Sequence, residues 1–471
     1  MKLHDLEIDR IINDSNNHFI KEELIPFLKI PSTTLNPEGV SKARDFLKSY
    51  ISNMVEKSID IPGVINPLTF SWIKGQSKAI LLIYMMYDTQ PVNNHDMWIV
   101  EPFSGEFSIL KSPLDTLGDC LISRGAYNSK TPLLCFLNIL RIMKERDMLP
   151  MSLLLVFDSE EEQGSPTLLK LLHTKKELFH DCVDAYYPAM KQELNRTAIL
   201  KLGYKGILSL TIIASTENNE VHSSFGSMIP NPVNDLISVL NSIHFDGNFK
   251  IDSLKQTYKI NQEERDLMNN LSTKTSFITV KKKRGINQSL VTNDEKSFYN
   301  YLFHPSFNIS TIKSGYIDGG IKNVVPNYAE CNIDIRYAHD IKIDTIYQEI
   351  KKIVDNYNKK SRSHIDLIKN IGYEGSRVKR DTNLILSIHK SFEFLDIKYE
   401  EWPLSAAAAP LSSIKNELGL NFIVGGLGIG GNAHAPNEFI QVESILDARR
   451  FIYYFLHFYA KLNKKEEFNR K

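Results

Sequence analysis

Four short polar segments carry the reactive side chains of this chain. They are residues 86–91 (MYDTQP), 123–130 (SRGAYNSK), 160–165 (EEEQGS) and 432–438 (NAHAPNE). Carboxylates and imidazoles are groups that move protons and bind metal ions. Each segment alone also fits a structural role, because a Glu triplet is typical of a helix start and a single His in a glycine-rich loop is often structural. Their joint occurrence, in this order, favours a functional site.

These segments need elements that position them at strand ends, where α/β proteins build their sites. Continuous apolar runs at residues 79–87 and 152–157 predict buried strands that end just before Asp88 and Asp158. Between them, Pro132 opens a stretch with leucines at helical spacing, as proline does in a first helical turn. Strand, helix, strand at this spacing predicts an α/β domain.

The pattern changes after Gly203. Apolar residues at helical spacing follow Pro232, and residues 329–336 alternate between apolar and polar, which predicts a strand with one solvated face. Residues 204–373 are therefore expected to form an inserted α+β domain, in which the polar stretch 246–298 is an elaborated loop with short helices. Residues 374–471 return to helices and an apolar strand, so we expect residues 1–203 and 374–471 to form one discontinuous α/β domain.

The composition excludes several classes of protein. The 471 residues include 56 basic and 56 acidic side chains, and the pI is near 7.2, which argues against a nucleic-acid binder. The four cysteines are too few and too scattered for a disulfide framework. The longest apolar runs are too short to cross a bilayer, and the amino terminus does not read as a signal peptide. We expect a soluble, cytoplasmic protein with no membrane partner.

In combination the motifs resemble one superfamily of metallopeptidases and deacylases. It contains carnosinase-type dipeptidases, aminoacylases, acetylornithine deacetylase and succinyl-diaminopimelate desuccinylase, and the dipeptidase branch is the most similar. The resemblance extends over most of the chain. Further matching motifs are Trp98 with Glu101-Pro102-Phe103, Gly203-Tyr204-Lys205-Gly206, Val221-His222-Ser223, Val324-Val325-Pro326 and Asp334-Ile335-Arg336.

The resemblance implies a fold, a chemistry and an assembly. The fold is a zinc-exopeptidase-like catalytic domain with a central mixed sheet, plus an inserted ferredoxin-like domain for dimerisation. The chemistry is amide hydrolysis in dipeptides or N-acyl amino acids, in which two zinc ions acidify a water and a free Glu takes its proton. A His of the partner subunit's inserted domain stabilises the oxyanion, and an Arg binds the substrate carboxylate.

Mapped onto this chain, three of the five metal ligands are altered. Met86 stands at the first His position, and a neutral thioether does not suit Zn²⁺. Asn128 stands at the bridging Asp position, where an amide oxygen is a much weaker ligand. The other acidic ligand belongs near residues 188–190, which have no zinc-binding side chain, and the nearest carboxylate, Asp184, falls inside the preceding strand. The carboxylate-binding Gly-Ser segment corresponds to residues 406–410, which lack both residues.

The other functional positions are retained. They are Glu161 as base, Glu162 and His434 as ligands, Asp88 as the partner of the absent His, His222 for the oxyanion and Arg336 for the substrate carboxylate. One metal site keeps Glu162 and His434 with the weak ligand Asn128, and the other keeps almost nothing. The sequence therefore predicts one zinc ion at most, or none.

Three functional hypotheses remain open. The first is a non-catalytic homologue that binds a small peptide or N-acyl amino acid, or that serves as a partner subunit, as a homodimer or as a heterodimer with an active paralogue. The second is a weak dipeptidase or amidohydrolase with a single metal and Glu161 as general base. The third is a structural protein that uses the fold only for an interface. Each retained residue also has a structural interpretation: Arg336 paired within its own sheet, His222 as a loop cap and Met86 as a core residue.

Overall fold

The structure is a computed structural model that describes residues 3–283, 285–291, 293–316, 319–360 and 362–469. The chain divides into two compact units. Unit 1 comprises Met1–Leu202, Val378–Trp402 and Ser413–Lys471, and unit 2 comprises Gly203–Arg377 and Pro403–Ser412. Each unit is described by itself below.

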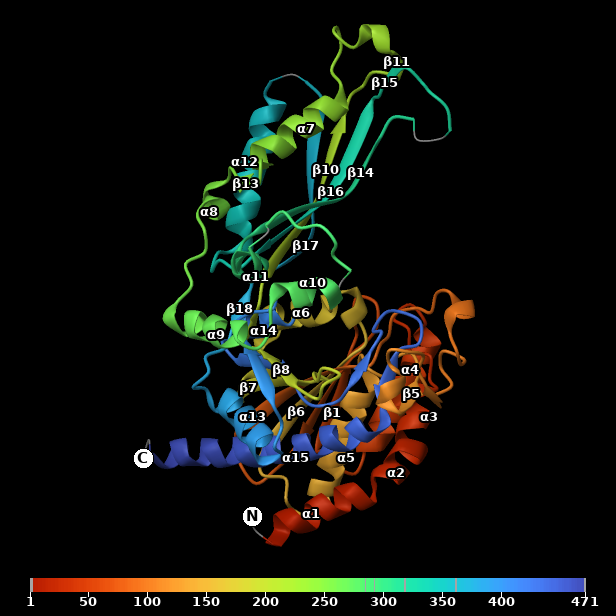
Figure 1. The fold of residues 1–471 in the computed structure, drawn as a ribbon, viewed down its shortest axis with the longest axis vertical. Helices are drawn as coiled ribbons and strands as arrows, with labels where there is room; N and C mark the ends of the chain where they lie inside the picture. The colour runs from red at the N-terminus through yellow and green to blue at the C-terminus, as the bar shows by residue number, and fades with distance from the viewer. Residues whose placement is uncertain (1–2, 284, 292, 317–318, 361, 470–471) are drawn as a thin grey trace. The chain divides into compact units, whose positions relative to one another are not determined.

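Unit 1 is built on a six-stranded mixed sheet (Figure 1). Four neighbouring strands are parallel, and the two at one edge are antiparallel. The parallel strands are almost fully buried, which explains why they read as continuous apolar runs. In sheet order the strands are β1 (Lys57–Ile61), β2 (Leu68–Ile73), β6 (Ser152–Asp158), β3 (Ile80–Met86), β7 (Cys182–Pro188) and β20 (Asn421–Gly425).

Helices cover this sheet. Almost every residue of helix α5 (Lys130–Lys144) is buried. It contacts β3, β7 and α15 (Val442–Asn469), which in turn contacts α13 (Asn383–Phe394). Helix α5 begins at Lys130, so that Pro132 lies in its first turn, as its missing N–H allows. The other α-helices are α1 (Leu3–Asp14), α2 (Asn16–His18), α3 (Ile25–Leu28), α4 (Pro37–Ile51), α6 (Pro166–Thr174) and α14 (Ser412–Leu418), and Phe19–Leu24 form a π-helical turn. Four short 3-10 helices are His95–Met97, Asp115–Leu117, Glu161–Gln163 and Lys176–Phe179.

A second, smaller sheet in unit 1 brings two distant loops together. Its strands, in order, are β21 (Gly430–Gly431), β22 (Phe439–Gln441), β5 (Asp119–Ile122) and β4 (Glu106–Ile109). Antiparallel pairing of β22 with β5 places Phe439 opposite Ile122. The loop that follows β5, residues 123–130, therefore lies beside the loop that precedes β22, residues 432–438. A parallel pair, β8 (Ala198–Lys201) and β19 (Tyr399–Trp402), completes the unit's strands.

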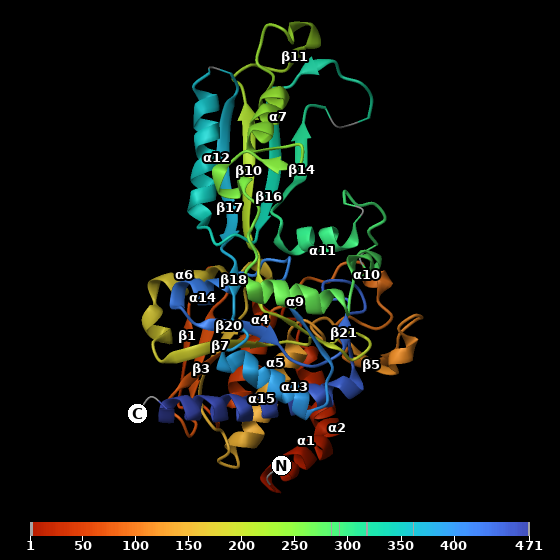
Figure 2. The same ribbon diagram turned by 60° about the vertical axis from the view of Figure 1, so that its left-hand side comes forward.

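Unit 2 has the ferredoxin-like arrangement expected for the inserted domain. Its four-stranded sheet is antiparallel, and α7 (Pro232–Ile243) and α12 (Ile343–Asn358) lie along it (Figure 2). Buried side chains of both helices form one core with the inward-facing residues of the strands, such as Leu208 and Ile333. In sheet order the strands are β14 (Ser306–Ser314), β16 (Tyr328–Tyr337), β10 (Gly206–Ser215) and β17 (His364–Tyr373).

The polar stretch within unit 2 contains short helices and strands, as expected. Helix α9 is the longest of them and begins with a capping box, in which Asn261 and Glu264 bond each other's backbone. The elements are β12 (His244–Phe245), β13 (Asn248–Phe249), α8 (Asp252–Lys255), α9 (Gln262–Ser272), α10 (Phe277–Lys283) and α11 (Asp294–Phe303). The remaining pairs of the unit are β9 (Gly203–Tyr204) with β18 (Ser376–Arg377), and β11 (Val221–His222) with β15 (Val324–Val325).

The compact units differ from the expected domain limits at residues 203, 374–377 and 403–412. The sequence assigns all of residues 374–471 to the α/β domain, whereas the structure groups Pro403–Ser412 with unit 2. The reason is backbone hydrogen bonding: the Ser405 N–H donates to the Gly203 carbonyl, and the Lys205 N–H donates to the carbonyls of Ser405 and Ala407. Over the described residues, no helix is both long and apolar enough to cross a membrane.

Candidate functional site

The central sheet of unit 1 brings two of the four polar segments to one edge. Strands β3 and β6 are parallel neighbours, and the last residue of β3, Met86, lies opposite Asp158 at the end of β6. Asp88 follows β3 and Glu161 follows β6, so both lie beyond the carboxyl ends of adjacent strands, where α/β sheets place ligands. The loops 123–130 and 432–438 complete the site from the smaller sheet.

Asp88 fixes the backbone of the glutamate segment. Its carboxylate is fully buried and accepts hydrogen bonds from the Glu161 N–H at 3.3 Å, the Glu162 N–H at 3.1 Å and the Thr34 hydroxyl at 2.8 Å. Burial, followed by the charge of Asp158, raises the pKa of Asp88 well above its usual range. Asp88 therefore orients the turn Glu161–Gln163, although no imidazole stands at position 86.

Glu162 is the centre of a group of side chains that we call the Glu162 cluster: Gln90, Asn128, Glu162 and His434. The Glu162 side chain is only 4% exposed. Gln90 Nε2 donates to its Oε2 at 2.7 Å, and Asn128 Nδ2 donates to its Oε1 at 3.2 Å. His434 Nε2 lies 3.3 Å from Glu162 Oε1 and 3.3 Å from Asn128 Nδ2. Both oxygens of this carboxylate thus accept a hydrogen bond from a side-chain amide.

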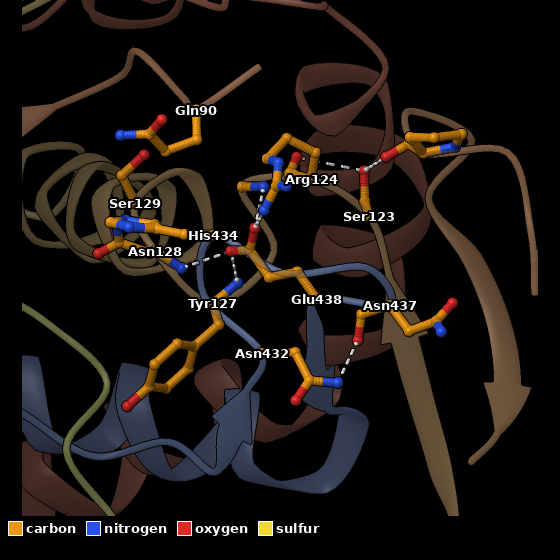
Figure 3. Close-up of polar contacts among 12 residues, drawn as sticks. Gln90, Ser123, Arg124, Tyr127, Asn128, Ser129, Asn432, His434, Asn437 and Glu438 are labelled. Atoms are coloured by element: carbon orange, nitrogen blue, oxygen red, sulfur yellow. Dashed lines mark hydrogen bonds and ion pairs between the residues drawn. The ribbon is translucent and has the colours of Figure 1, made fainter. Parts of the chain in front are cut away.

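A second buried carboxylate, Glu438, binds the backbone of Asn128, a member of the cluster. Figure 3 shows it between Arg124 and the backbone of Tyr127 and Asn128. It forms a 2.9 Å ion pair with Arg124, and it accepts hydrogen bonds from the N–H groups of Gly125, Tyr127 and Asn128 at 2.8 to 3.0 Å. We call this set the Glu438 cradle. It fixes the backbone position of Asn128 and ties the loops 123–130 and 432–438 together.

The loop that carries His434 has an unusual backbone. Asn432, His434 and Asn437 all adopt positive φ angles, of 56°, 65° and 58°. Non-glycine residues adopt this conformation only where the surroundings impose it, and such sites cluster at functional positions. Here the Asn437 side chain bonds the backbone of Met97 and Ile99, while the Asn432 side chain donates to the Asn437 carbonyl (Figure 3).

The donor set of this site does not fit two zinc ions. The Met86 side chain is buried, with 1% exposure, and offers only a thioether. Asn128 brings an amide to the position where a bridging carboxylate is needed. Residues 188–190 (PAM) have no oxygen or nitrogen in their side chains. Asp184 is engaged elsewhere, with Asn421 and the Tyr459 hydroxyl. Among the described residues, no group of three or more His, Cys, Asp or Glu side chains is arranged to bind a metal ion.

The charges of the site perturb its titratable groups. Burial, followed by the charges of Glu162, Asp88 and Asp158, raises the pKa of Glu161 well above its usual range. The contact with Glu162 raises the pKa of the half-exposed His434 imidazole above its usual value. Glu161 is half-buried, and within the described part of the chain no side chain donates a hydrogen bond to its carboxylate.

Sequence reasoning assigned no role to several residues of the site, including Arg124 and Glu438 of the Glu438 cradle. Gln90 belongs to a segment that was singled out, but without a role for its amide. Lys191 was not considered, although it follows β7 directly after the residues 188–190 where an acidic ligand is expected. It is half-buried, and its charge lowers the pKa of Glu161. The signal that could have identified it is its position, one residue after the stretch where the family resemblance predicts an acidic ligand.

His222 and Arg336 lie in unit 2. The His222 ring accepts a hydrogen bond from the Ser224 N–H and lies 2.9 Å from the Ser224 hydroxyl, so it caps its own loop. Arg336 on β16 is 36% exposed and lies 3.5 Å from Asp334 of the same strand. Both contacts are the structural ones anticipated from the sequence, and both side chains remain accessible within the unit.

Comparison with known proteins confirms the resemblance expected from the sequence. Residues 202–362 match the M20 peptidase dimerisation domain. The Cys-Gly metallodipeptidase DUG1 of Candida albicans is 24% identical over 396 residues, which cover 82% of this chain and 79% of that protein. The Saccharomyces cerevisiae protein of the same name is 22% identical, over 82% of this chain and 80% of its own length.

Solved structures have the same fold. The M20 family metallo-carboxypeptidase Sso-CP2 of Sulfolobus solfataricus superposes with a TM-score of 0.82 at 22% identity, over 94% of this chain and 99% of that one. The dipeptidase Dug1p of Saccharomyces cerevisiae gives a TM-score of 0.76 at 20% identity, over 98% and 99% of the two chains. At these identities the solved structures establish the fold, and the roles of individual residues depend on the geometry above.

Proposed function

Because this chain has the M20 peptidase fold and carries its dimerisation domain, yet has a changed donor set, we propose that it is a non-catalytic relative of the metal-dependent dipeptidases. One observation carries the proposal. Both oxygens of Glu162, a retained ligand position, accept hydrogen bonds from the amides of Gln90 and Asn128. A carboxylate whose partners are amide donors is satisfied without a cation.

The chemistry supports the same conclusion. Hydrolysis by a pair of metal ions needs a water acidified by both ions and a free carboxylate that takes its proton. Glu161 is a free carboxylate, but Met86 and residues 188–190 supply no ligand for one ion, and Asn128 supplies no bridging charge. Without such acidification, a water beside Glu161 is too weak a nucleophile to attack an amide.

The ligand we propose is a small peptide or an N-acyl amino acid. The relatives named above are dipeptidases and a carboxypeptidase, which act on molecules of this class. The partly exposed guanidinium of Arg336 is suited to a carboxylate, which it can bind in a bidentate manner.

The test compares the wild-type chain with a variant in which the ligands are restored, Met86→His, Asn128→Asp and Ala189→Asp. Both are purified in buffer containing zinc, manganese and cobalt, and the metal content per chain is measured by elemental analysis. We expect the wild-type chain to contain far less metal than the restored variant and to lack dipeptidase activity. Stoichiometric metal in the wild type, together with activity that Glu161→Gln abolishes, contradicts the proposal.

A second candidate function, a hydrolase with a single metal, is favoured by one geometric observation. Asn128 Nδ2, Glu162 Oε1 and His434 Nε2 are mutually 3.2 to 3.3 Å apart. A tetrahedral zinc ion with ligands about 2.0 Å away separates them by about 3.3 Å. A half-turn of the Asn128 amide brings Oδ1 to the place of Nδ2. In this case His434→Ala removes the metal found in the wild type, while folding is unchanged.

We also propose that the chain forms dimers through unit 2, either with itself or with an active paralogue. The match of residues 202–362 to a dimerisation domain supports dimer formation. His222 and Arg336 are retained on that unit, where the family resemblance assigns His222 to the partner's site. To test the heterodimer, this chain and an active paralogue are co-expressed with different tags, and the dimers are identified by native mass spectrometry. Recovery of homodimers alone contradicts the heterodimer.

A further inference from the structure

The carboxylates of the site differ in how they are satisfied. Asp88 accepts three hydrogen bonds, and both Glu162 and Glu438 have donors on both of their oxygens. Glu160, the residue before Glu161, accepts hydrogen bonds from the N–H groups of Ile65, Asn66 and Thr167. Glu161 alone among these five has no donor within the described residues, although it is half-buried. A half-buried carboxylate without a donor is incomplete and is suited to a ligand.

Lys191 is the complementary group. It follows β7, which lies next to β3, while Glu161 follows β6 on the other side of β3. The three strands are parallel, so both residues lie beyond the same edge of the sheet. The Lys191 carbonyl is bound to the Ile199 N–H, and the next residue, Gln192, is fixed to Gly428, so the backbone that carries the ammonium is well anchored.

No hydrogen bond or ion pair joins the two groups. Burial lowers the pKa of Lys191, and the Glu161 charge raises it. Yet no ion pair joins them within 4.0 Å, and the Lys191 ammonium has no hydrogen-bond or ion-pair partner among the described residues. Met86, whose side chain is 1% exposed, ends β3, the strand between them. A carboxyl group and an amino group, each without a side-chain partner among the described residues, therefore follow strands on either side of β3.

We propose that Glu161 and Lys191 form a metal-independent site for a small zwitterion, an amino acid or dipeptide, whose ammonium binds Glu161 and whose carboxylate binds Lys191. This inference rests on the proposed function, because it names the ligand of a chain that binds rather than cleaves. The site does not include Arg336 of unit 2, to which the family resemblance assigns a substrate carboxylate. A lysine is suited to this role, since its three ammonium donors can bind a carboxylate without further partners.

Calorimetric titration of the EDTA-treated full-length chain with glycylglycine tests the proposal. We expect binding by the wild type and by Lys191→Arg, and a weakening of about tenfold or more in Lys191→Met and in Glu161→Gln, because each loses one charge-assisted hydrogen bond. Lys78→Met, at an exposed lysine at the opposite end of β3, is the matched control and is expected to bind as the wild type does. Thermal melts establish that each variant is folded.

Blocked probes identify which end of the ligand each residue binds. Glycylglycine amide lacks the carboxylate, so we expect Lys191→Met to change its affinity little, whereas Glu161→Gln still weakens it. N-acetyl-glycylglycine lacks the ammonium, and the pattern is expected to reverse. Absence of wild-type binding, or equal binding by Lys191→Met and the wild type, overturns the proposal.

The result is independent of the metal question. Metal content and hydrolysis decide whether the chain is non-catalytic, whereas this titration is performed without metal. Lys191-dependent binding by a chain that also proves to be a hydrolase would refute the proposed function and leave this site standing. If the chain is metal-free and inactive, and Lys191→Met binds glycylglycine as well as the wild type does, the proposed function stands and the Glu161–Lys191 site is refuted.

Discussion

Glu162 and Glu438 are both almost fully buried in unit 1, but they are held in different ways. Glu438 has three backbone N–H donors and one arginine. The partners of Glu162 are all side chains, from three separate segments. Backbone donors persist when side chains are exchanged, whereas a cluster of side chains changes with each substitution. The comparison explains how the backbone support of a site can persist while the side chains of the site change.

The largest expected effect concerns the Glu438 cradle. Glu438→Ala leaves Arg124, which is only 3% exposed, buried without its partner, so we expect a loss of about 3–5 kcal/mol in the free energy of unfolding. Urea denaturation measures it. Glu438→Gln, which keeps the shape and one acceptor, is expected to lose less. An equal or smaller loss in unfolding free energy for Glu438→Ala than for a substitution in the Glu162 cluster would mean that the backbone donors of Glu438 give it no additional stability.

A carboxylate introduced at position 128, where the family resemblance predicts a bridging Asp, tests the Glu162 cluster directly. Asn128→Asp replaces a hydrogen-bond donor by a negative charge beside Glu162, and we expect it to destabilise the metal-free chain by about 2–3 kcal/mol. Addition of zinc chloride should then raise the melting temperature of the variant more than that of the wild type. Equal zinc responses in the two chains would mean that Asn128 does not limit metal binding.

Gln90→Met removes the shortest hydrogen bond of the Glu162 cluster, at 2.7 Å. A hydrogen bond to a buried charge contributes about 1.5–3 kcal/mol, so we expect a loss of about 2 kcal/mol from the free energy of unfolding. Gln163→Met is the matched control, because Gln163 is exposed and lies next to Glu162 in the turn Glu161–Gln163. We expect this variant to lose little free energy of unfolding. Equal losses in both would assign the effect to the change in side-chain type rather than to the contact.

The smallest effect is pH-dependent. Glu162 raises the pKa of His434 above its usual value of 6.5, so the folded state favours the protonated imidazole. This stabilisation is present in full below pH 6.5 and is lost as the pH rises through the folded-state pKa. Because His434 is 53% exposed, we expect only about a few tenths of a kcal/mol. Unfolding of the wild type and of His434→Ala, compared at acidic and alkaline pH, measures it; a larger difference at alkaline pH contradicts the assignment.

Much of the fold was predictable because its buried strands are continuous apolar runs. Strands β3 and β6 begin and end within one residue of the runs at 79–87 and 152–157. The alternation at 329–336 likewise identified β16, because one face of that strand packs on helices and the other does not. The grouping of Pro403–Ser412 with unit 2 was not predictable, since it depends on backbone pairing with residues some 200 positions away.

The contacts of the site were less accessible to sequence reasoning. The four polar segments were recognised by their residue types and order. That Asp88 binds the backbone of Glu161 and Glu162, or that the Gln90 amide points at Glu162, depends on side-chain directions set by packing between distant loops. Lys191 was missed for a different reason, because a family pattern directs attention to positions where a ligand is expected and not to what has replaced it.

The discontinuity of unit 1 has a consequence for synthesis on the ribosome. Unit 2 is complete once residue 412 has emerged, whereas the sheet of unit 1 still lacks β20 and its helix α5 still lacks α15. Domains fold as units while the chain is made, so unit 2 can form first and the apolar side of α5 stays uncovered until the last segment arrives. In the nascent chain, the surface of α5 that contacts α15 in the folded protein is therefore the part of this helix that is covered last.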